Sequence, residues 1–335
     1  MKKKVTMQDI ADKLGITKVS VSKAINNQPG ISAELRKQIL STAKQSGYIK
    51  TKHTKEVKKY NLAIVCPKRF FLDDESFYTT IYYYINKRCS EEGHTLSCFV
   101  ISQSDEMAGK LPDQLTENYF DGIFISGEFH KNFLSQLVNI SCSKVAIDFY
   151  RPEFQMDSII VDNFVAGQEA TDYLIQKGHK DIGFVGNILG TSSICDRYFG
   201  YLKALSLNML TIREDWHIIN GDCLTGLYTP EAPLPQELPT AFVCHCDKAA
   251  LVLMQQLRSR GVSVPEQVSI ISFDNTRVCE LLSPRLTSVE IDRQQIAYSS
   301  IDRMFHNIQH PEAAPQKIYL GSHLIERDSV RSLLG

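Results

Sequence analysis

Residues 5–26 have the sequence VTMQDIADKLGITKVSVSKAIN, in which two short amphipathic segments flank a single glycine. The first segment carries an apolar stripe at helical spacing, formed by Met7, Ile10, Ala11 and Leu14. Thr6 and Asp9 stand where a helix N-cap and its capping-box partner are expected, and Gly15 suits the left-handed end of a helix. This spacing predicts one short helix before the glycine.

Two further helices are predicted downstream, each preceded by a hydroxyl-bearing cap residue. Thr17 caps a predicted helix over Lys18–Asn26, whose inward side chains are Val21, Ala24 and Ile25. After a breaker cluster at residues 26–30, Ser32 caps a third helix that ends near Gly47. Two short helices around a glycine-containing turn, closed by a third helix, are typical of a helix-turn-helix, whose second helix enters the DNA major groove.

The outer face of the second helix carries groups that suit DNA contacts, and the residues expected to be exposed there are Lys18, Val19, Ser20, Ser22 and Lys23. A lysine can donate to guanine O6 and N7, and a valine methyl can pack against a thymine methyl. Hydroxyl groups nearby suit phosphate oxygens. Three short amphipathic helices also occur in proteins that never contact DNA, so periodicity alone leaves both interpretations open.

The charge of the chain is unevenly distributed. Residues 1–59 contain 14 lysines and arginines against four acidic residues, a net charge of +10, whereas the whole chain has a net charge of −1. The remaining residues therefore carry a net charge of −11. A basic head on an acidic body fits phosphate binding, because neutralised phosphates release counterions. A lysine-rich end that only solubilises the chain is the alternative.

From residue 62 onward, apolar runs of strand length alternate with amphipathic stretches of helical length. The predicted strands are Leu62–Cys66, Leu96–Ile101, Gly122–Ile125, Val145–Ile147, Ile159–Val161, Ile182–Val185, His217–Ile219, Ala241–Cys244, Val268–Phe273 and Thr287–Ile291. The predicted helices are Phe77–Glu92, Asn163–Lys177, Asp196–Leu207, Asp247–Arg260 and Arg293–Ile308. Such alternation predicts parallel sheets, and this many strands favours two α/β lobes with a ligand site in the cleft between them.

Several classes of protein are disfavoured by the composition and the motifs. The chain has no apolar run of membrane-spanning length and no apolar run behind Met1–Lys4, so neither a membrane span nor a secretory signal is expected. Nine cysteines without regular spacing fit reduced thiols in the cytoplasm. No dinucleotide fingerprint, nucleophile elbow or phosphate-binding loop is present, so we expect neither an enzyme nor a cofactor.

Cys244-His245-Cys246 invites a metal interpretation. If all three residues continue one strand, Cys244 and Cys246 share one face and His245 takes the other, so they cannot close on one ion. We therefore expect a buried strand and no metal site at this tripeptide.

The head resembles that of the lactose-repressor/galactose-repressor family over residues 5–11 and 15–26. By position, the resemblance implies that Lys18, Val19 and Lys23 contact bases. It implies phosphate contacts by Thr17, Ser20, Ser22 and Asn26, and Thr6 and Tyr48 are also expected to contact DNA. Two departures matter: Ser20 replaces the usual threonine and Lys23 the usual arginine, so the planar fork that recognises guanine is missing. We therefore expect an operator that differs from the family's common one.

Residues 49–61 are polar and basic, as expected of a hinge. In the resembled family this stretch forms a small helix whose leucine wedges into the minor groove. This chain has no Pro-Asn after Tyr48, and Lys55-Glu56-Val57 stands where Arg-x-Leu is usual. Val57 is thus the candidate wedge, and a disordered basic tether is the alternative.

The resemblance extends through the body and so covers nearly the whole chain. The matching stretches are Val161–Gly167, Gly178–Ile182, Arg197–Tyr201, Ser272–Thr276 and Ser283–Val289. It implies a two-lobed effector domain like that of periplasmic sugar-binding proteins. The predicted organisation is a helix-turn-helix head at residues 1–48, a hinge at 49–61 and the effector-binding and dimerisation domain at 62–335.

The same resemblance implies which residues contact the effector. Arg197 and Asp274 are expected to hold ligand hydroxyls or a carboxylate, and Phe77 and Asp148 complete the expected set. Taken alone, Arg197 equally fits a surface arginine, and Asp274 equally fits a turn former before Asn275.

Three features suggest an unusual ligand. Cys223 stands where the family often has an aromatic residue that stacks on a sugar ring, and Cys246 stands where an asparagine is common. In the first cleft loop, residues 67–78, Lys68 and Arg69 either meet an anionic group of the ligand or are solvated loop charges.

The sequence as a whole predicts a cytoplasmic, ligand-responsive transcriptional regulator, most simply a repressor. It would bind a pseudo-palindromic operator as a homodimer, with a tetramer left open, and sense a sugar-like effector. The competing hypothesis is a periplasmic-type sugar-binding module without a DNA-binding role. That module needs a signal peptide and no basic head, which is the reverse of the pattern observed here.

Overall fold

The computed structural model describes residues 5–26, 28–48, 58–71, 77–222, 229 and 232–334. The chain divides into two compact units, residues 1–58 and residues 59–335, which we call the head and the body. Val57 and Cys223, two of the predicted contact residues, lie outside the described residues.

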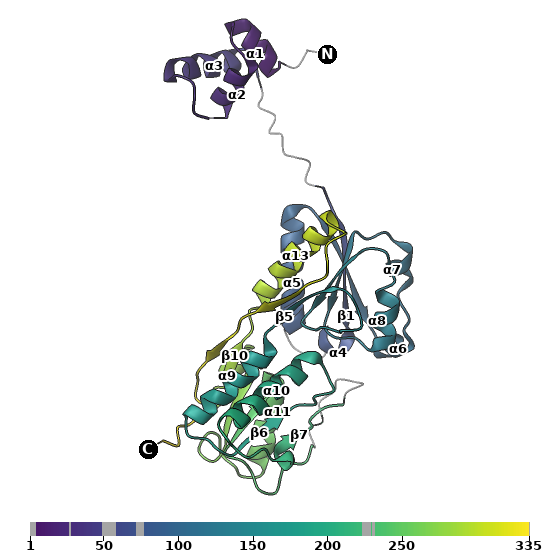
Figure 1. Cartoon of the computed structure of the whole chain (residues 1–335), viewed down its shortest axis with the longest axis vertical. Coiled ribbons are helices and arrows are strands. Elements are labelled where there is room, and N and C mark those ends of the chain that lie inside the picture. Colours follow the sequence, from purple (N-terminus) through teal and green to yellow (C-terminus); the bar gives the residue numbers. More distant parts are fainter. Residues whose placement is uncertain are drawn as a thin grey trace. The chain divides into compact units, whose positions relative to one another are not determined.

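The head contains three helices, which are α1 Met7–Leu14, α2 Lys18–Ile25 and α3 Ala33–Gln45 (Figure 1). All three predicted caps are confirmed, because the hydroxyl groups of Thr6, Thr17 and Ser32 each accept the backbone N–H three residues later at 3.2 Å. Asp9 completes the capping box of α1, and Gly15 ends that helix with a φ of 63°. Local sequence therefore sets the helix boundaries of the head.

The three helices pack around a small apolar core made of the fully or nearly buried side chains Ile10, Ala11, Val21, Ala24, Ile39 and Ala43. Ile25, predicted to face inward, is only partly buried. Arg36 ties α3 to the end of α2, since its guanidinium donates to the carbonyl oxygens of Lys23 and Ala24, both at 3.4 Å. These carbonyls lie in the last turn of α2, where backbone acceptors lack helical partners.

The body has two lobes, each built on a six-stranded sheet. The sheet of the first lobe has the order β11-β5-β4-β3-β1-β2 and is parallel throughout. Its strands are β1 Asn61–Pro67, β2 Thr95–Ile101, β3 Gly122–Ser126, β4 Ser143–Ile147, β5 Asp157–Val161 and β11 Lys317–Leu320. Its helices are α4 Lys68–Phe71, α5 Phe77–Glu92, α6 Gln103–Ala108, α7 Asp113–Glu117, α8 Lys131–Leu137 and α13 Arg293–Gln309.

The sheet of the second lobe has the order β12-β10-β9-β8-β6-β7, in which only β12 is antiparallel to its neighbour. Its strands are β6 Ile182–Val185, β7 His217–Ile218, β8 Ala241–Cys244, β9 Ser269–Asp274, β10 Thr287–Glu290 and β12 His323–Ile325. Its helices are α9 Asn163–Gln176, α10 Ser192–Leu207, α11 Asp247–Ser259, α12 Val278–Leu281 and the short 3-10 helix Glu214–Trp216.

Each sheet is covered on both faces, as parallel sheets require. In the first lobe, α5 and α13 pack on one face, and the core of the other face includes Leu115 of α7 and Phe133 of α8. In the second lobe, α9 and α10 cover one face and α11 the other. The chain passes from one lobe to the other after β5, after β10 and after β11, so each lobe is assembled from separate parts of the sequence (Figure 1).

The structure confirms the predicted fold and all ten predicted strands within a few residues. Strands β11 and β12 and several short helices were not predicted. Helix α10 begins at Ser192 rather than at residue 196, because the Thr191 side chain accepts the Ile194 N–H at 3.3 Å and caps the helix earlier. Among the residues that the structure describes, no helix is long and apolar enough to cross a membrane.

Candidate effector cleft and DNA-binding surface

The candidate base-reading residues lie on α2 with different exposures. Val19 is 63% exposed, and Lys18 is also exposed. The expectation that Ser20, Ser22 and Lys23 are fully exposed is wrong, since all three are half-buried. Val19 is therefore the most prominent apolar group on the outer face of this helix.

Hydrogen bonds to residues nearby in the sequence accompany the partial burial of the two serines. The Ser20 hydroxyl lies 3.0 Å from the Thr17 hydroxyl, and the Ser22 hydroxyl accepts the Asn26 side-chain amide at 3.2 Å. The side chain of Lys23 lies along the backbone of the loop at Gly30. These groups are already organised at the N-terminal and C-terminal ends of α2.

Two other predicted DNA contacts also have local roles. The Thr6 hydroxyl donates to the Asp9 carboxylate at 2.8 Å within the capping box, and it remains exposed. Tyr48 packs against the apolar core of the head with part of its ring. A tyrosine in this setting can bury its ring and still present its hydroxyl to a phosphate.

The predicted effector residues gather around a cavity of about 480 Å³ between the lobes. Phe77 and Asp148 come from the first lobe, and Arg197, Cys246 and Asp274 come from the second lobe. Asp148 directly follows β4, Cys246 precedes α11, and Asp274 ends β9. These side chains thus lie at the carboxyl ends of parallel strands, where ligands bind in open α/β folds.

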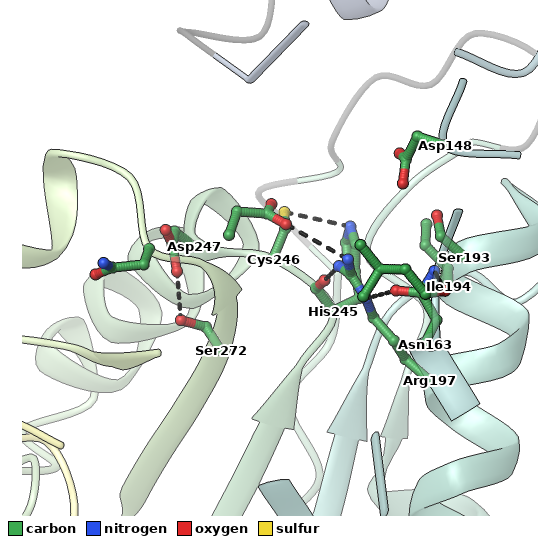
Figure 2. A network of polar contacts seen from close by, with 12 residues as sticks. Asp148, Asn163, Ser193, Ile194, Arg197, His245, Cys246, Asp247 and Ser272 are labelled. Atoms are coloured by element: carbon green, nitrogen blue, oxygen red, sulfur yellow. Dashed lines mark hydrogen bonds and ion pairs between the residues drawn. The ribbon is translucent and has the colours of Figure 1, made fainter. Parts of the chain in front are cut away.

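Arg197 lies at the centre of the second-lobe side of this cavity and is only 4% exposed, so it is not a surface arginine. Its Nε donates to Asn163 Oδ1 at 2.8 Å, one terminal nitrogen donates to the His245 carbonyl, and the other lies 3.5 Å from Asp274 Oδ1 (Figure 2). The guanidinium also stacks 4.6 Å from the centre of the Phe273 ring. Its orientation is therefore fixed from several sides before any ligand binds.

The loop after β9 has an unusual backbone. Asp274 and Asn275 have φ values of 98° and 43°, a region that side chains other than glycine rarely occupy. Several contacts hold it: Arg293 donates to the Asp274 carbonyl at 2.6 Å, the Asn275 N–H donates to the Ser288 hydroxyl at 3.0 Å, and the buried Asp247 carboxylate accepts the Thr276 N–H at 2.6 Å. Asp274 is thus both a turn residue and an ion-pair partner of Arg197, and such local strain is characteristic of functional sites.

Asp148 faces the Arg197 group from the opposite lobe (Figure 2). Its Oδ2 accepts the Tyr78 hydroxyl at 2.7 Å, whereas its buried Oδ1 has no hydrogen-bond partner among the described residues. Burial raises the pKa of the Asp148 carboxyl to about 6, against the opposing influence of Arg197 and the Tyr78 hydroxyl. A buried carboxylate oxygen without a partner is a ready acceptor for a ligand hydroxyl.

We expect the substitution Asp148→Asn to stabilise the ligand-free protein at pH 7.5. Between pH 4 and 6 the native carboxyl holds a proton that the unfolded chain releases, so stability falls as pH rises through this window. Above pH 6 the penalty is about 3 kcal/mol, from a pKa difference of about two units at about 1.4 kcal/mol each. Thermal unfolding should show a higher melting temperature for Asp148→Asn than for the wild-type protein at pH 7.5, and a much smaller difference at pH 5. Equal melting temperatures of Asp148→Asn and the wild-type protein at pH 7.5 would contradict this prediction. Asp113→Asn, at an exposed carboxyl, is the control and should melt like the wild-type protein.

His245 belongs to the cavity although the sequence did not single it out as a ligand contact. Strand β8 ends at Cys244, so the strand alternation assumed for Cys244-His245-Cys246 fails after that residue. The His245 ring lies beside its neighbour, with Nε2 3.5 Å from the Cys246 sulfur and Nδ1 3.2 Å from the Val185 carbonyl. No group of three metal-binding side chains occurs within the described ranges.

Burial, reinforced by the charge of Arg197, lowers the pKa of His245 to about 4, so the imidazole is neutral near pH 7. Nδ1–H then donates a hydrogen bond to the Val185 carbonyl, and Nε2 accepts one from the Cys246 thiol. His245 therefore adds a neutral ring to the cavity wall. Its position directly after a strand's carboxyl end is the sequence signal that could have identified it.

The two basic residues of the first cleft loop differ. Lys68 is exposed, as the solvated alternative expects. Arg69 is neither solvated nor free, because it forms an ion pair with the buried Glu106 and donates to the Glu128 carbonyl at 2.8 Å. Its charge is compensated within the first lobe, and its side chain lines the cleft.

This geometry defines a class of protein: a two-lobed ligand-binding body that carries a helix-turn-helix head. Two family descriptions match the chain, "Bacterial regulatory proteins, lacI family" over residues 6–50 and "Periplasmic binding protein-like domain" over residues 171–330. The chain belongs to the lacI family of bacterial regulatory proteins, which are transcription regulators.

Named relatives agree with this assignment. The chain is 26% identical over 340 residues to the HTH-type transcriptional repressor PurR of Actinobacillus pleuropneumoniae serotype 3, covering 98% of this chain and 99% of that protein. Among solved structures, a complex of the regulator CelR with cellobiose matches 97% of this chain and 100% of that chain, at 23% identity and a TM-score of 0.66. The Lac repressor dimer bound to operator and the anti-inducer ONPF matches 98% of this chain and 100% of that chain, at 18% identity and a TM-score of 0.67.

Proposed function

We propose that this regulator is a repressor that binds a pseudo-palindromic operator as a homodimer and responds to a small, neutral, sugar-like ligand in the cleft of each body. The observation that carries the proposal is the pairing of a helix-turn-helix head with a cleft in which Arg197, Asp274 and Asp148 converge. The relatives named as repressors, the operator-bound Lac repressor dimer and the cellobiose complex support it. Such a protein acts in the cytoplasm, where operator DNA is present.

The head supplies sequence recognition in this proposal. Helix α2 enters the major groove with Lys18 and Val19 toward the base edges, while Thr17, Ser20, Ser22 and Asn26 contact phosphates. Lys23 reaches bases from its half-buried position, and Thr6 and Tyr48 fix the head on the backbone. Residues 49–61 act as the hinge, with Val57 as the candidate minor-groove wedge.

The charges around the cleft favour a neutral ligand over an anionic one. Arg197 already pairs with Asp274, and Arg69 already pairs with Glu106. A ligand phosphate would have to displace one of these carboxylates, whereas hydroxyl groups can add hydrogen bonds to both members of a pair. The free oxygen of Asp148 is a further acceptor that suits a hydroxyl and repels an anion.

Contacts between the lobes provide a route for regulation. Glu128 of the first lobe accepts the Ser192 N–H of the second lobe at 2.7 Å, and the Tyr150 hydroxyl lies 3.1 Å from Asp196 on α10. Both contacts lie beside the cleft, at the start of the helix that carries Arg197. A ligand that binds one lobe arrangement more tightly shifts the balance between arrangements, and through it the spacing of the two heads.

We expect Val19→Ala to reduce operator discrimination. Loss of the two valine methyl groups from a base contact costs about 1–2 kcal/mol, at about 0.8 kcal/mol per buried carbon, which is a roughly 5- to 30-fold loss of affinity. The operator would be selected from random DNA with the full chain, and binding to it and to unrelated DNA would be measured by fluorescence anisotropy. The variant should lose affinity for the selected site only. Leu40→Ala, at an exposed position on α3, is the matched control; an equal loss on both DNAs would show that Val19 reads no base.

A further inference from the structure

The cleft has a second compartment beyond the Arg197 cavity. Its wall includes Asn187, Asn220, Gly221 and Asp222 of the second lobe. Both compartments share the side chains Phe70, Thr191, Ile194 and His245. The two cavities are therefore neighbouring parts of one cleft, and these four residues lie where the two parts adjoin.

Asn220 is the distinctive residue of the second compartment. It follows β7 and is 4% exposed, yet neither its side-chain oxygen nor its side-chain nitrogen has a hydrogen-bond partner among the described residues. Asn187 in the same wall is satisfied, since it donates to the Gly221 carbonyl at 2.8 Å and accepts the Leu189 N–H at 3.0 Å. A buried amide with both ends unpaired is rare, because desolvation is then uncompensated.

The chemistry of this amide defines its complement. An asparagine side chain offers one acceptor and two donor hydrogens side by side, so its natural partner is a ligand group with an adjacent donor and acceptor. A pair of neighbouring hydroxyls on a sugar and the edge of a nucleobase both have this pattern. Arg69, at the wall of this compartment, is paired with Glu106, and Asp222 in the same wall carries a negative charge, so the described side chains favour a neutral ligand group.

The boundary between the two compartments suits a linkage between two rings. Phe70 and Ile194 present apolar surfaces there. The Arg69 guanidinium, which forms the ion pair with Glu106, lies 4.5 Å from the centre of the Phe70 ring. Apolar and aromatic surfaces with a few converging polar groups are typical of small-molecule sites. One ring would lie among Asp148, Arg197 and Asp274, and the other beside Asn220.

We propose that the effector is a neutral glycoside of two rings, and that Asn220 selects it by binding the second ring. This inference rests on the proposed effector cleft and goes beyond it by fixing ligand size and a specificity-determining residue. A single-ring sugar would fill only the Arg197 compartment and leave the Asn220 amide unpaired. Disaccharides and nucleosides share the required chemistry.

The test is isothermal titration calorimetry of the full chain against matched sets of ligands. One arm compares maltose, cellobiose and lactose with glucose and galactose, and the other compares adenosine and guanosine with ribose, adenine and guanine. We expect at least one two-ring glycoside to bind about a hundredfold tighter than either of its component rings. The arm that contains it identifies the source of the second ring.

Asn220→Leu should lower the affinity for that glycoside to the affinity of the single ring that binds beside Arg197. Asn220→Asp should lose the hydrogen bonds that the amide donates to the second ring. Because the amide has no partner in the ligand-free protein, Asn220→Leu should leave the melting temperature unchanged or raise it, which a structural role would not allow.

Two outcomes would overturn the inference. One is that single rings bind as tightly as every two-ring compound; the other is that Asn220→Leu binds the selected glycoside normally. A single-ring ligand that still releases operator DNA would leave the proposed function intact, whereas a glycoside that binds without any effect on operator affinity would count against the proposed function alone.

Discussion

Arg197→Ala is expected to abolish the response to effector while operator binding in the absence of effector is preserved. The guanidinium is held by Asn163, the His245 carbonyl and Asp274, and it faces the cavity from the second lobe. Each charge-assisted hydrogen bond to a ligand contributes about 1.5–3 kcal/mol, so two lost contacts weaken effector binding by at least about a hundredfold. Titration calorimetry would give the effector affinity, and anisotropy would give operator affinity with and without effector.

Because Arg197 is buried, the alanine variant also leaves Asp274 without its ion-pair partner, and part of the effect could come from lost stability. Arg197→Lys separates the two contributions: it keeps the charge but cannot donate to three acceptors in fixed directions. We expect the lysine variant to melt near the wild-type temperature and still to respond poorly. Arg213→Ala, at a half-buried arginine of the same lobe that is not among the residues lining the cavity, should respond normally. A normal response of Arg197→Ala would remove this residue from the site.

Asp247→Ala is expected to cause the largest loss of stability among these variants. Its carboxylate is 1% exposed and accepts the Ser272 hydroxyl at 2.6 Å, the Ser288 hydroxyl at 2.7 Å, and both the N–H and the hydroxyl of Thr276. It thereby joins the start of α11 to β9, β10 and the strained loop at Asp274; Figure 2 shows its hydrogen bond to Ser272 on β9. Removing one side of such a buried network typically costs about 3–5 kcal/mol.

Urea unfolding followed by circular dichroism should show a large drop in the midpoint for Asp247→Ala. Asp247→Asn keeps one acceptor oxygen and should lose less. Asp215→Ala, at an exposed carboxyl of the same lobe, should unfold at the wild-type midpoint. A loss below about 1 kcal/mol in Asp247→Ala would mean that the loop at Asp274 is held by its other contacts, chiefly Arg293.

The head was predictable in detail because its determinants are local. Each helix start depends on a hydroxyl and the N–H three residues later, and the end of α1 depends on Gly15. Exposure on α2 was harder to predict, since it depends on side-chain contacts such as that of Ser22 with Asn26. Helical periodicity assigns a face but does not reveal which polar groups on that face pair with one another.

In the body, buried strands were visible as apolar runs, whereas β11 and β12 were not. Both lie at the edge of their sheets and are partly exposed, so Lys317 and His323 break the apolar pattern. Strand β7 has only two residues, which gave no warning that the asparagine after it would line the cleft. Edge and very short strands carry little periodic signal.

The positions of most candidate site residues were predicted, but the ion pairs among the charged residues of the site were not. Five predicted residues line one cavity, and the resemblance supplied all five positions: Asp148, Cys246 and Asp274 near strand ends, and Phe77 and Arg197 on helices. The ion pair of Arg69 with Glu106 joins residues 37 positions apart, and no local pattern indicates it. The assumed alternation through Cys246 failed because the strand ends two residues earlier. What sequence lacks here is the long-range packing that decides which charges remain available to a ligand.

The most direct test of the account is to remove the head and measure both kinds of binding. A body consisting of residues 59–335 corresponds to one compact unit of the fold. Calorimetry should show that it binds effector with the affinity of the full chain, and anisotropy should show that it has lost binding to the selected operator. Operator affinity that survives the deletion would contradict the account, because DNA recognition would then not depend on the helix-turn-helix.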